Sequence, residues 1–66
     1  METGIIAKKT DKGYGFIKRD NNEKDLFFHS NELQNIGFEA LMEGDKVSFE
    51  VGDSPKGQNA ININKI

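Results

Sequence analysis

Two short segments decide the fold expected for this chain: KGYGFI at residues 12–17 and DLFFHS at residues 25–30. Successive side chains of a β-strand point to opposite faces, so each segment divides its residues between two faces. If the two strands pair antiparallel, one face of the pair is apolar. That face consists of Ile17, Leu26 and Phe28. It predicts the side of the sheet that packs on a hydrophobic core.

The other face of the same pair is aromatic. It consists of Tyr14, Phe16, Phe27 and His29. A core needs only one face of a sheet, so rings on the second face require another explanation. The alternative, that these rings pack inside the protein, is disfavoured because the same strands already supply a full apolar face. Unpaired bases stack on exposed rings, and the sequence therefore predicts a surface for single-stranded nucleic acid.

Three further strands are expected outside the two aromatic segments. They lie at residues 3–7, 46–51 and 59–66, where small, β-branched or alternating residues occur. In the second of them, alternation predicts that Val47, Phe49 and Val51 point inward. In the last, Ile61 and Ile63 are expected to face the same way.

The connections expected between these strands are short, with one exception. They are a tight turn at residues 11–13, a turn around Asn21 and Asn22, a long connection with one helical turn at residues 32–34, a turn at residues 43–45 and a loop at residues 52–57. Five short strands with one long connection are typical of a small barrel. The expected fold class is all-β, a five-stranded antiparallel OB-type Greek-key barrel that forms one domain over residues 1–66. Such a barrel binds its ligand on the second and third strands, where the rings fall.

Composition argues against several classes of site. The chain has no cysteine and one histidine, so neither a disulfide nor a structural zinc site is expected. Paired carboxylates, catalytic triads and metal-ligand clusters do not occur at a workable spacing, and we expect neither an enzyme nor a cofactor. The first residues do not resemble a signal peptide, and no segment approaches the roughly 20 apolar residues that span a bilayer. A soluble, cytoplasmic protein with no membrane partner is expected.

Charge is unevenly distributed, although the net charge is only −2. Residues 8–24 contain six lysine or arginine residues and three acids, a local charge of +3. The rest of the chain contains three lysines and eight acids, a local charge of −5. The basic segment coincides with the aromatic one, which favours contact with phosphates over a merely solvated face.

The two aromatic segments resemble the first and second ribonucleoprotein motifs of the cold-shock domain family. The similarity continues through Gly37-Phe38, Leu41, Glu43-Gly44, Lys46-Val47-Ser48-Phe49, Lys56-Gly57 and Asn62, and it spans essentially the whole chain. RNA-recognition domains share the first motif, but they need two helices and a longer chain. The resemblance implies an OB-type barrel that binds single-stranded RNA and DNA, favours pyrimidine-rich stretches, and acts as an RNA chaperone or transcription antiterminator.

The resemblance also implies a set of binding residues. The stacking residues implied by position are Tyr14, Phe16, Phe27, His29 and Phe38. Lys12 would lie at the phosphates, with Asp25 and Lys56 at the edges of the site. Lys18 is a further candidate because it alternates with the rings, whereas Arg19 is expected to point away.

The chain departs from the family in two places. The first strand reads Ile5-Ile6-Ala7-Lys8-Lys9 where members usually carry Trp-Phe, and Ser30 stands where many have phenylalanine. Lys8, together with Lys9, is expected to replace stacking by charge at that end of the site.

Several assignments stay open from the sequence. Phe38 is expected either to stack on a base or to cap the core. The asparagines of the last strand either hydrogen-bond bases or form a polar outer face; they are Asn59, Asn62 and Asn64. The chain is expected to be a monomer. The alternative function is a small barrel that contacts other proteins through the same aromatic patch.

Overall fold

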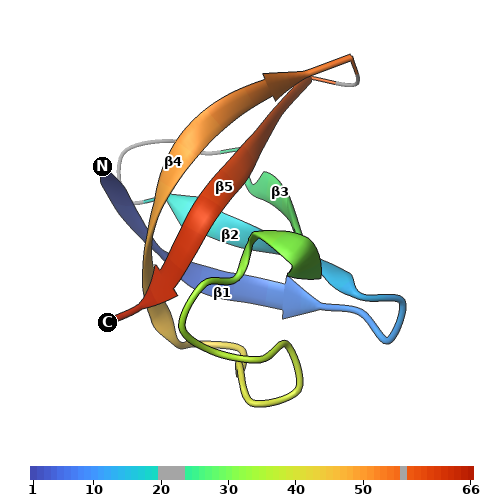
Figure 1. Ribbon diagram of the computed structural model, residues 1–66, viewed down its shortest axis with the longest axis vertical. Coiled ribbons are helices and arrows are strands. Elements are labelled where there is room, and N and C mark those ends of the chain that lie inside the picture. The colour runs from blue at the N-terminus through green and yellow to red at the C-terminus, as the bar shows by residue number, and fades with distance from the viewer. Residues whose placement is uncertain (20–23, 56) are drawn as a thin grey trace.

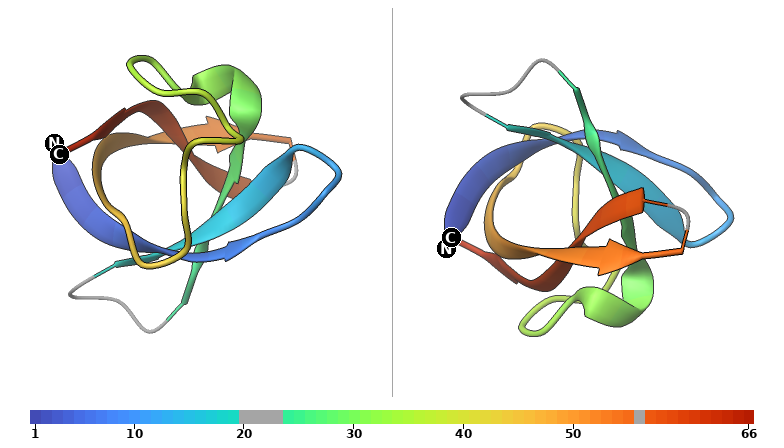
Figure 2. Two further views of the ribbon diagram at one scale, coloured as in Figure 1. Left: turned by 90° about the horizontal axis from the view of Figure 1, so that it is seen from below. Right: turned by 90° about the horizontal axis from the view of Figure 1, so that it is seen from above.

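The computed structural model describes residues 1–19, 24–55 and 57–66, and in it five strands close into a barrel (Figure 1). The elements are β1 (Glu2–Lys9), β2 (Tyr14–Arg19), β3 (Leu26–His29), the 3₁₀ turn η1 (Ser30–Glu32), β4 (Lys46–Ser54) and β5 (Gly57–Lys65). Around the barrel the strands follow the order β1-β2-β3-β5-β4, and β4 closes the ring by pairing with β1. The connection between η1 and β4 crosses one end of this ring (Figure 2, left).

The predicted fold class, an all-β five-stranded barrel of OB type, is confirmed. The strand pairings are antiparallel except for one, because β3 meets β5 in the parallel sense at Phe27 and Asn59. Parallel neighbours require a crossover connection, and the chain from η1 through β4 provides it. This crossover brings the end of the β4–β5 hairpin beside the aromatic strand β3.

The core is formed by side chains on the inner face of the five strands, together with one side chain from the long connection. Its buried apolar residues are Ile6, Ile17, Leu26, Phe28, Leu41, Val47, Phe49, Ala60 and Ile63. The apolar face predicted for the β2–β3 hairpin is thereby confirmed. Leu41 comes from the connection and is fully buried. Val51, which was predicted to point inward, is only half-buried and packs at the margin of the core.

The last strand, β5, does not alternate as predicted. Ile63 is fully buried, whereas Ile61 is half-buried and Ala60 takes the other core position. The register of β4 against β5 shifts in this region, with β5 carrying one residue more. Asn62 adopts φ 50°, a left-handed conformation that asparagine tolerates better than most residues. The bulge turns the two isoleucines to different sides, and the prediction that they face the same way is wrong.

The β4–β5 hairpin is longer than the sequence indicated. A loop was predicted at residues 52–57, but the ladder continues as far as the pair Ser54–Gly57. Ser54 Oγ donates to the carbonyl oxygen of Gly57 at 2.7 Å, which stabilises the end of the hairpin. The loop prediction is therefore wrong for most of its length. Lys56 lies outside the described residues.

The single helical turn begins at Ser30, ahead of the predicted residues 32–34. His29 caps it, because its Nδ1 accepts the backbone N–H of Asn31 at 3.2 Å. The Leu33 N–H then donates to the Ser30 carbonyl and completes the turn. In the described part of the chain no helix is long and apolar enough to cross a membrane.

The tight turns predicted around glycine are present at two places. Gly13, between β1 and β2, has φ 92°, and Gly44, before β4, has φ 94°. Residues with a side chain rarely adopt such backbone angles, so glycine is required there. The predicted turn around Asn21 and Asn22 lies outside the described residues.

Candidate nucleic-acid interface

Three aromatic rings, which we call the ring cluster, lie together on the outer side of the β2–β3 hairpin. They belong to Tyr14, Phe16 and Phe27. The centroid of the Phe27 ring lies 5.4 Å from that of Tyr14 and 6.0 Å from that of Phe16. The Phe16 ring stands nearly perpendicular to its two neighbours, at interplanar angles of 85° and 74°. Edge contacts of this kind fix the rings against one another.

The ring cluster is separate from the hydrophobic core. Phe27 is 38% exposed and Tyr14 and Phe16 are half-buried, whereas Phe28, the next residue in β3, is fully buried. In the antiparallel register Phe16 lies opposite Phe27, and residues opposite each other share a face of the sheet. The rings of the two residues therefore lie on the same outer face. The structure thus places the three rings on the side that the sequence predicted.

Gly15 lets the wall of the barrel close tightly behind the ring cluster. A Cβ atom at Gly15 would lie against the carbonyl oxygen of Lys8 and 2.9 Å from a ring carbon of Phe28. Neither the backbone of β1 nor the core ring can move away cheaply, so only glycine fits.

His29 extends the aromatic side of β3. It is exposed and lies opposite Tyr14 in the β2–β3 ladder. Because Nδ1 accepts the N–H of Asn31, the imidazole ring is oriented, and Nε2 takes no part in this bond. Among the described residues no group of three or more histidine or acidic side chains is placed to hold a metal ion.

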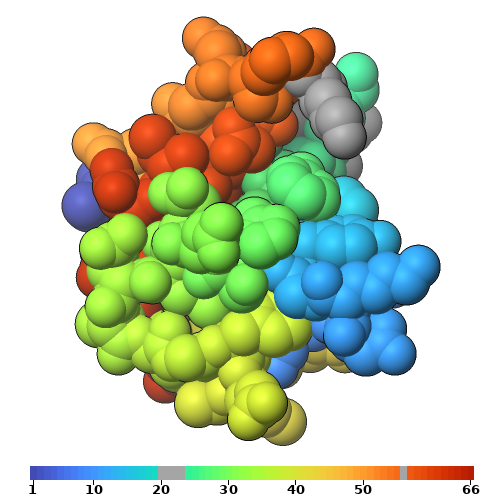
Figure 3. All heavy atoms as spheres, turned by 45° about the vertical axis from the view of Figure 1, so that its right-hand side comes forward, coloured from blue at the N-terminus to red at the C-terminus, as the bar shows by residue number. Residues whose placement is uncertain are grey.

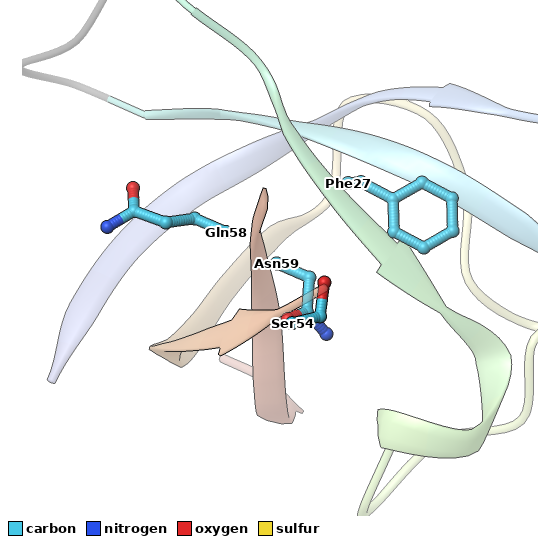
Figure 4. Close-up of a pocket in the computed structure, with 4 residues that line it drawn as sticks. All are labelled: Phe27, Ser54, Gln58 and Asn59. Atoms are coloured by element: carbon cyan, nitrogen blue, oxygen red, sulfur yellow. The ribbon is translucent and has the colours of Figure 1, made fainter. Parts of the chain in front are cut away.

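A hollow lies beside Phe27, where β3 meets the β4–β5 hairpin. It is lined by Phe27, Ser54, Gln58 and Asn59. Figure 4 shows Ser54 and Asn59 pointing toward the side of the Phe27 ring, whereas Gln58 extends away from it. The Asn59 Oδ1 atom is buried and has no hydrogen-bond partner among the described residues. A buried polar atom without a partner is uncommon, and the Asn59 amide would gain a hydrogen bond if it turned toward a donor in the hollow.

Sequence reasoning missed most of this hollow. Ser54 was assigned to a loop, and Gln58 was not considered. Asn59 was left between base contact and a polar outer face. The parallel approach of β5 to β3 brings these residues beside Phe27, and no local pattern in the sequence signals such a long-range contact.

A second hollow lies where the β1–β2 turn faces the long connection between η1 and β4. It is lined by Lys9, Thr10, Asp11, Gly13, Phe38 and Glu39. In Figure 3 the β1–β2 turn (blue) adjoins the residues that follow β3 (green) and the connection (yellow-green) on one face. Phe38 is half-buried, with its ring centroid 6.3 Å from that of Phe28. It therefore caps the core and also borders the hollow, so the two readings left open by the sequence are compatible.

Lys8 lies next to the ring cluster because of a bulge in β1. Ile6 pairs with Ile17, but two residues later Lys8 pairs with Phe16, so Ala7 is the extra residue of β1. Lys8 is exposed and shares the outer face with Phe16. Its ammonium group is thus available to a phosphate near the rings.

The other charged candidates are placed as follows. Lys12 is exposed in the β1–β2 turn, Lys18 is exposed in β2, and Asp25 is exposed just before β3. The Arg19 side chain is 11% exposed, with Nη1 4.0 Å from a carboxylate oxygen of Glu2. Arg19 therefore points away from the ring cluster, as expected.

A closed five-stranded barrel with solvent-facing rings on its second and third strands defines the class of OB-type nucleic-acid-binding modules. The model of the 'Cold-shock' DNA-binding domain family matches residues 2–66. The chain belongs to the cold-shock DNA-binding domain family. The resemblance stated from the two aromatic segments is confirmed.

Relatives and a solved structure agree with this assignment. Cold shock protein CspC of Bacillus subtilis is 42% identical over 66 residues, which cover 98% of each chain. The major cold shock protein of Micrococcus luteus is 46% identical over 56 residues, covering 85% of this chain and 84% of the relative. Among solved structures, Drosophila Unr CSD456 superposes with a TM-score of 0.84 at 29% identity, covering 98% of this chain and 26% of that one.

Proposed function

We propose that this protein binds single-stranded RNA and DNA by stacking unpaired bases on the ring cluster. The observation that carries the proposal is the position of Tyr14, Phe16 and Phe27, which lie outside the core on the hairpin face and touch one another. Membership of a nucleic-acid-binding family supports it.

Stacking and charge contribute unequally in this proposal. Base–aromatic stacking is worth about 1–3 kcal/mol per base, so three rings supply roughly 3–9 kcal/mol. The upper part of this range corresponds to a micromolar Kd. Lysines near the rings add phosphate contacts; the proposed ones are Lys8, Lys12 and Lys18, with Lys56 as a further candidate outside the described residues. Asp25 and His29 border the rings and would contact base edges, and Phe38 would stack one more base.

The hollow beside Phe27 adds a means of reading a base. A pyrimidine stacked on Phe27 would bring its edge toward the Asn59 amide, whose buried Oδ1 lacks a partner among the described residues and would accept from the base once the amide turns into the hollow. Uracil and thymine carry an N–H on that edge, and this matches the pyrimidine-rich strands proposed as ligands. Hydrogen bonds to the edges of unstacked bases are a common means of sequence recognition in single strands, and this contact would add to any preference that stacking gives.

The proposed cellular role is that of an RNA chaperone or transcription antiterminator acting as a monomer in the cytoplasm. A protein that binds the open strand but not the paired one shifts a hairpin equilibrium toward the open form. No chemical step or nucleotide hydrolysis is needed for this shift.

Titration with single-stranded heptanucleotides tests the proposal directly. Tyr14 is the only tyrosine and the chain has no tryptophan, so fluorescence of the intact protein reports on the proposed site itself. We expect oligo-dT and oligo-rU to quench this fluorescence with a Kd at micromolar level or below, and a duplex of the same length to have little effect. Absence of binding to both single strands would overturn the proposal and leave the protein-binding alternative.

A further inference from the structure

Lys9 connects the end of β1 to the long connection between η1 and β4. Its ammonium group lies over the Phe38 ring, 4.8 Å from the centroid, and donates a hydrogen bond to the carbonyl oxygen of Leu41. Its backbone N–H donates to a carboxylate oxygen of Glu43 at 3.1 Å. One residue of β1 therefore contacts three positions of the same connection.

Lys8 and Lys9 have different surroundings because they are adjacent in a strand, and the bulge in β1 decides which of them faces outward. Lys8 lies opposite Phe16 and faces outward, whereas Lys9 lies opposite Gly15. Residues 15 and 16 of β2 point to opposite faces, so the two lysines do as well. Lys9 is accordingly half-buried and directed to the end of the barrel that the connection crosses.

Phe38 packs against the core from a connection that is anchored on either side of it. The connection is anchored near Leu41, whose side chain is buried and whose N–H donates to the Gly37 carbonyl at 3.1 Å. Phe38 lies between these two residues, on the stretch that passes the second hollow, and its ring is only half-buried against Phe28. The cation over its face is the further contact that fixes it.

We infer that Lys9 is a positioning residue, which holds Phe38 at the edge of the nucleic-acid surface and does not itself contact a phosphate. This inference rests on the proposed function, since it assumes that Phe38 stacks on a base. The two lysines of β1 then have different roles. Lys8 contacts a phosphate of the ligand, and Lys9 orients the Phe38 ring. A longer strand, which reaches Phe38, depends on Lys9, and a short strand confined to the ring cluster does not.

Two measurements separate a positioning role from a phosphate contact. A phosphate contact contributes about 0.7 to the slope of log affinity against log salt on single strands, so its removal lowers the slope by that amount. Loss of a positioning residue leaves the slope unchanged. A positioning role also makes the effect of Lys9 depend on the presence of the Phe38 ring, because substitutions that act through one another are not additive.

The experiment compares oligo-dT trinucleotides and heptanucleotides on four proteins: wild type, Lys9→Leu, Phe38→Leu and the double variant. We expect Lys9→Leu to weaken heptanucleotide binding about three- to fivefold, the range of a cation–π contact, and to leave trinucleotide binding and the salt slope unchanged. In the Phe38→Leu background the same substitution should have no further effect. Lys9→Arg, which keeps a cation and hydrogen-bond donors, should restore heptanucleotide affinity. Lys65→Leu, exposed at the far end of β5, is the matched control for loss of one positive charge.

Folding is checked by thermal melting and by hydrogen exchange of the Ala40 and Leu41 amides, which both donate to the Gly37 carbonyl. Faster exchange at these amides in Lys9→Leu supports the inference. If Lys9→Leu does not fold, Lys9→Gln replaces it. The inference is overturned if heptanucleotide affinity is unchanged, or if it falls together with the salt slope and falls equally in the Phe38→Leu background. Failure of the wild type to bind either oligonucleotide refutes the proposed function, which is a separate result.

Discussion

Replacing Phe27 by alanine tests the stacking argument at its most exposed ring. Phe27 is 38% exposed, contacts both other members of the ring cluster and borders the hollow at Asn59. A base stacked there would lose its ring entirely in Phe27→Ala. Stacking is worth about 1–3 kcal/mol per base. Since 1.4 kcal/mol corresponds to tenfold, we expect single-strand affinity to fall about tenfold, and at most somewhat over 100-fold.

The substitution is expected to leave the protein folded. It removes two ring–ring contacts, each worth about 0.5–1.5 kcal/mol, so the free energy of unfolding should fall by about 1–3 kcal/mol. A chain of 66 residues has a total stability of roughly 3–10 kcal/mol. Phe28→Ala differs sharply, because Phe28 is fully buried and the change costs about 3–5 kcal/mol and leaves a cavity. We expect that variant to melt well below Phe27→Ala.

The assay is fluorescence titration of folded protein with an oligo-dT heptanucleotide, after thermal melting has verified folding. Phe27→Leu serves as a second variant, because it keeps an apolar side chain and removes the ring face. Ile66→Ala, which truncates a 61% exposed apolar side chain at the chain end, controls for unspecific apolar contact. If Phe27→Ala and Phe27→Leu are folded and bind within twofold of the wild type, the ring cluster is not the stacking surface.

Three further predictions concern charge, base recognition and packing. The slope of log affinity against log salt should be shallow, roughly 1–3, because few lysines adjoin the rings and each phosphate contact contributes about 0.7. Titrations at several salt concentrations measure this slope, and a value well above the range would mean that charge, not stacking, dominates binding. Asn59→Leu should weaken oligo-dT binding about two- to tenfold, the value of one hydrogen bond, and should abolish discrimination against N3-methylthymine; discrimination that persists in the variant would remove Asn59 from the site. Gly15→Ala should lower stability by about 2 kcal/mol and the Tm by roughly 8–16 °C, because its Cβ would meet the Phe28 ring at 2.9 Å. Gly37→Ala, with no atom within 4 Å of its Cβ, should melt close to the wild type, and equal Tm values for the two variants would contradict the packing argument.

The central hairpin was predictable from the sequence because its information is local. The two-residue alternation separates aliphatic from aromatic side chains, and any antiparallel pairing that buries Phe28 must expose Phe27. The structure adds the register, with Phe16 opposite Phe27, and the contacts among the rings. The side of the barrel on which the rings lie thus followed from the pattern alone.

The departures from prediction arise where strands contain one residue more than their neighbours. In β1 the bulge at Ala7 decides which of the two adjacent lysines faces outward, and in β5 the bulge at Asn62 breaks the alternation of isoleucines. A bulge depends on the pairing with the neighbouring strand, so the sequence of the bulged strand alone does not specify it. The hollow beside Phe27 was missed for the same reason, since it depends on the parallel contact of β3 with β5.

The ring cluster combines two requirements that oppose each other in a small protein. Exposed rings leave apolar surface in water and add little to a core that a chain of 66 residues can only just build. Here the rings contact one another at centroid distances of 5.4–6.2 Å, so part of their surface is buried without being turned inward. The same contacts restrict their rotamers before any ligand arrives, which reduces the entropy lost on binding. If bases stack on these rings as proposed, the mutual packing of Tyr14, Phe16 and Phe27 serves stability and affinity together, and loss of one ring should loosen the other two as well as remove its own stacking face.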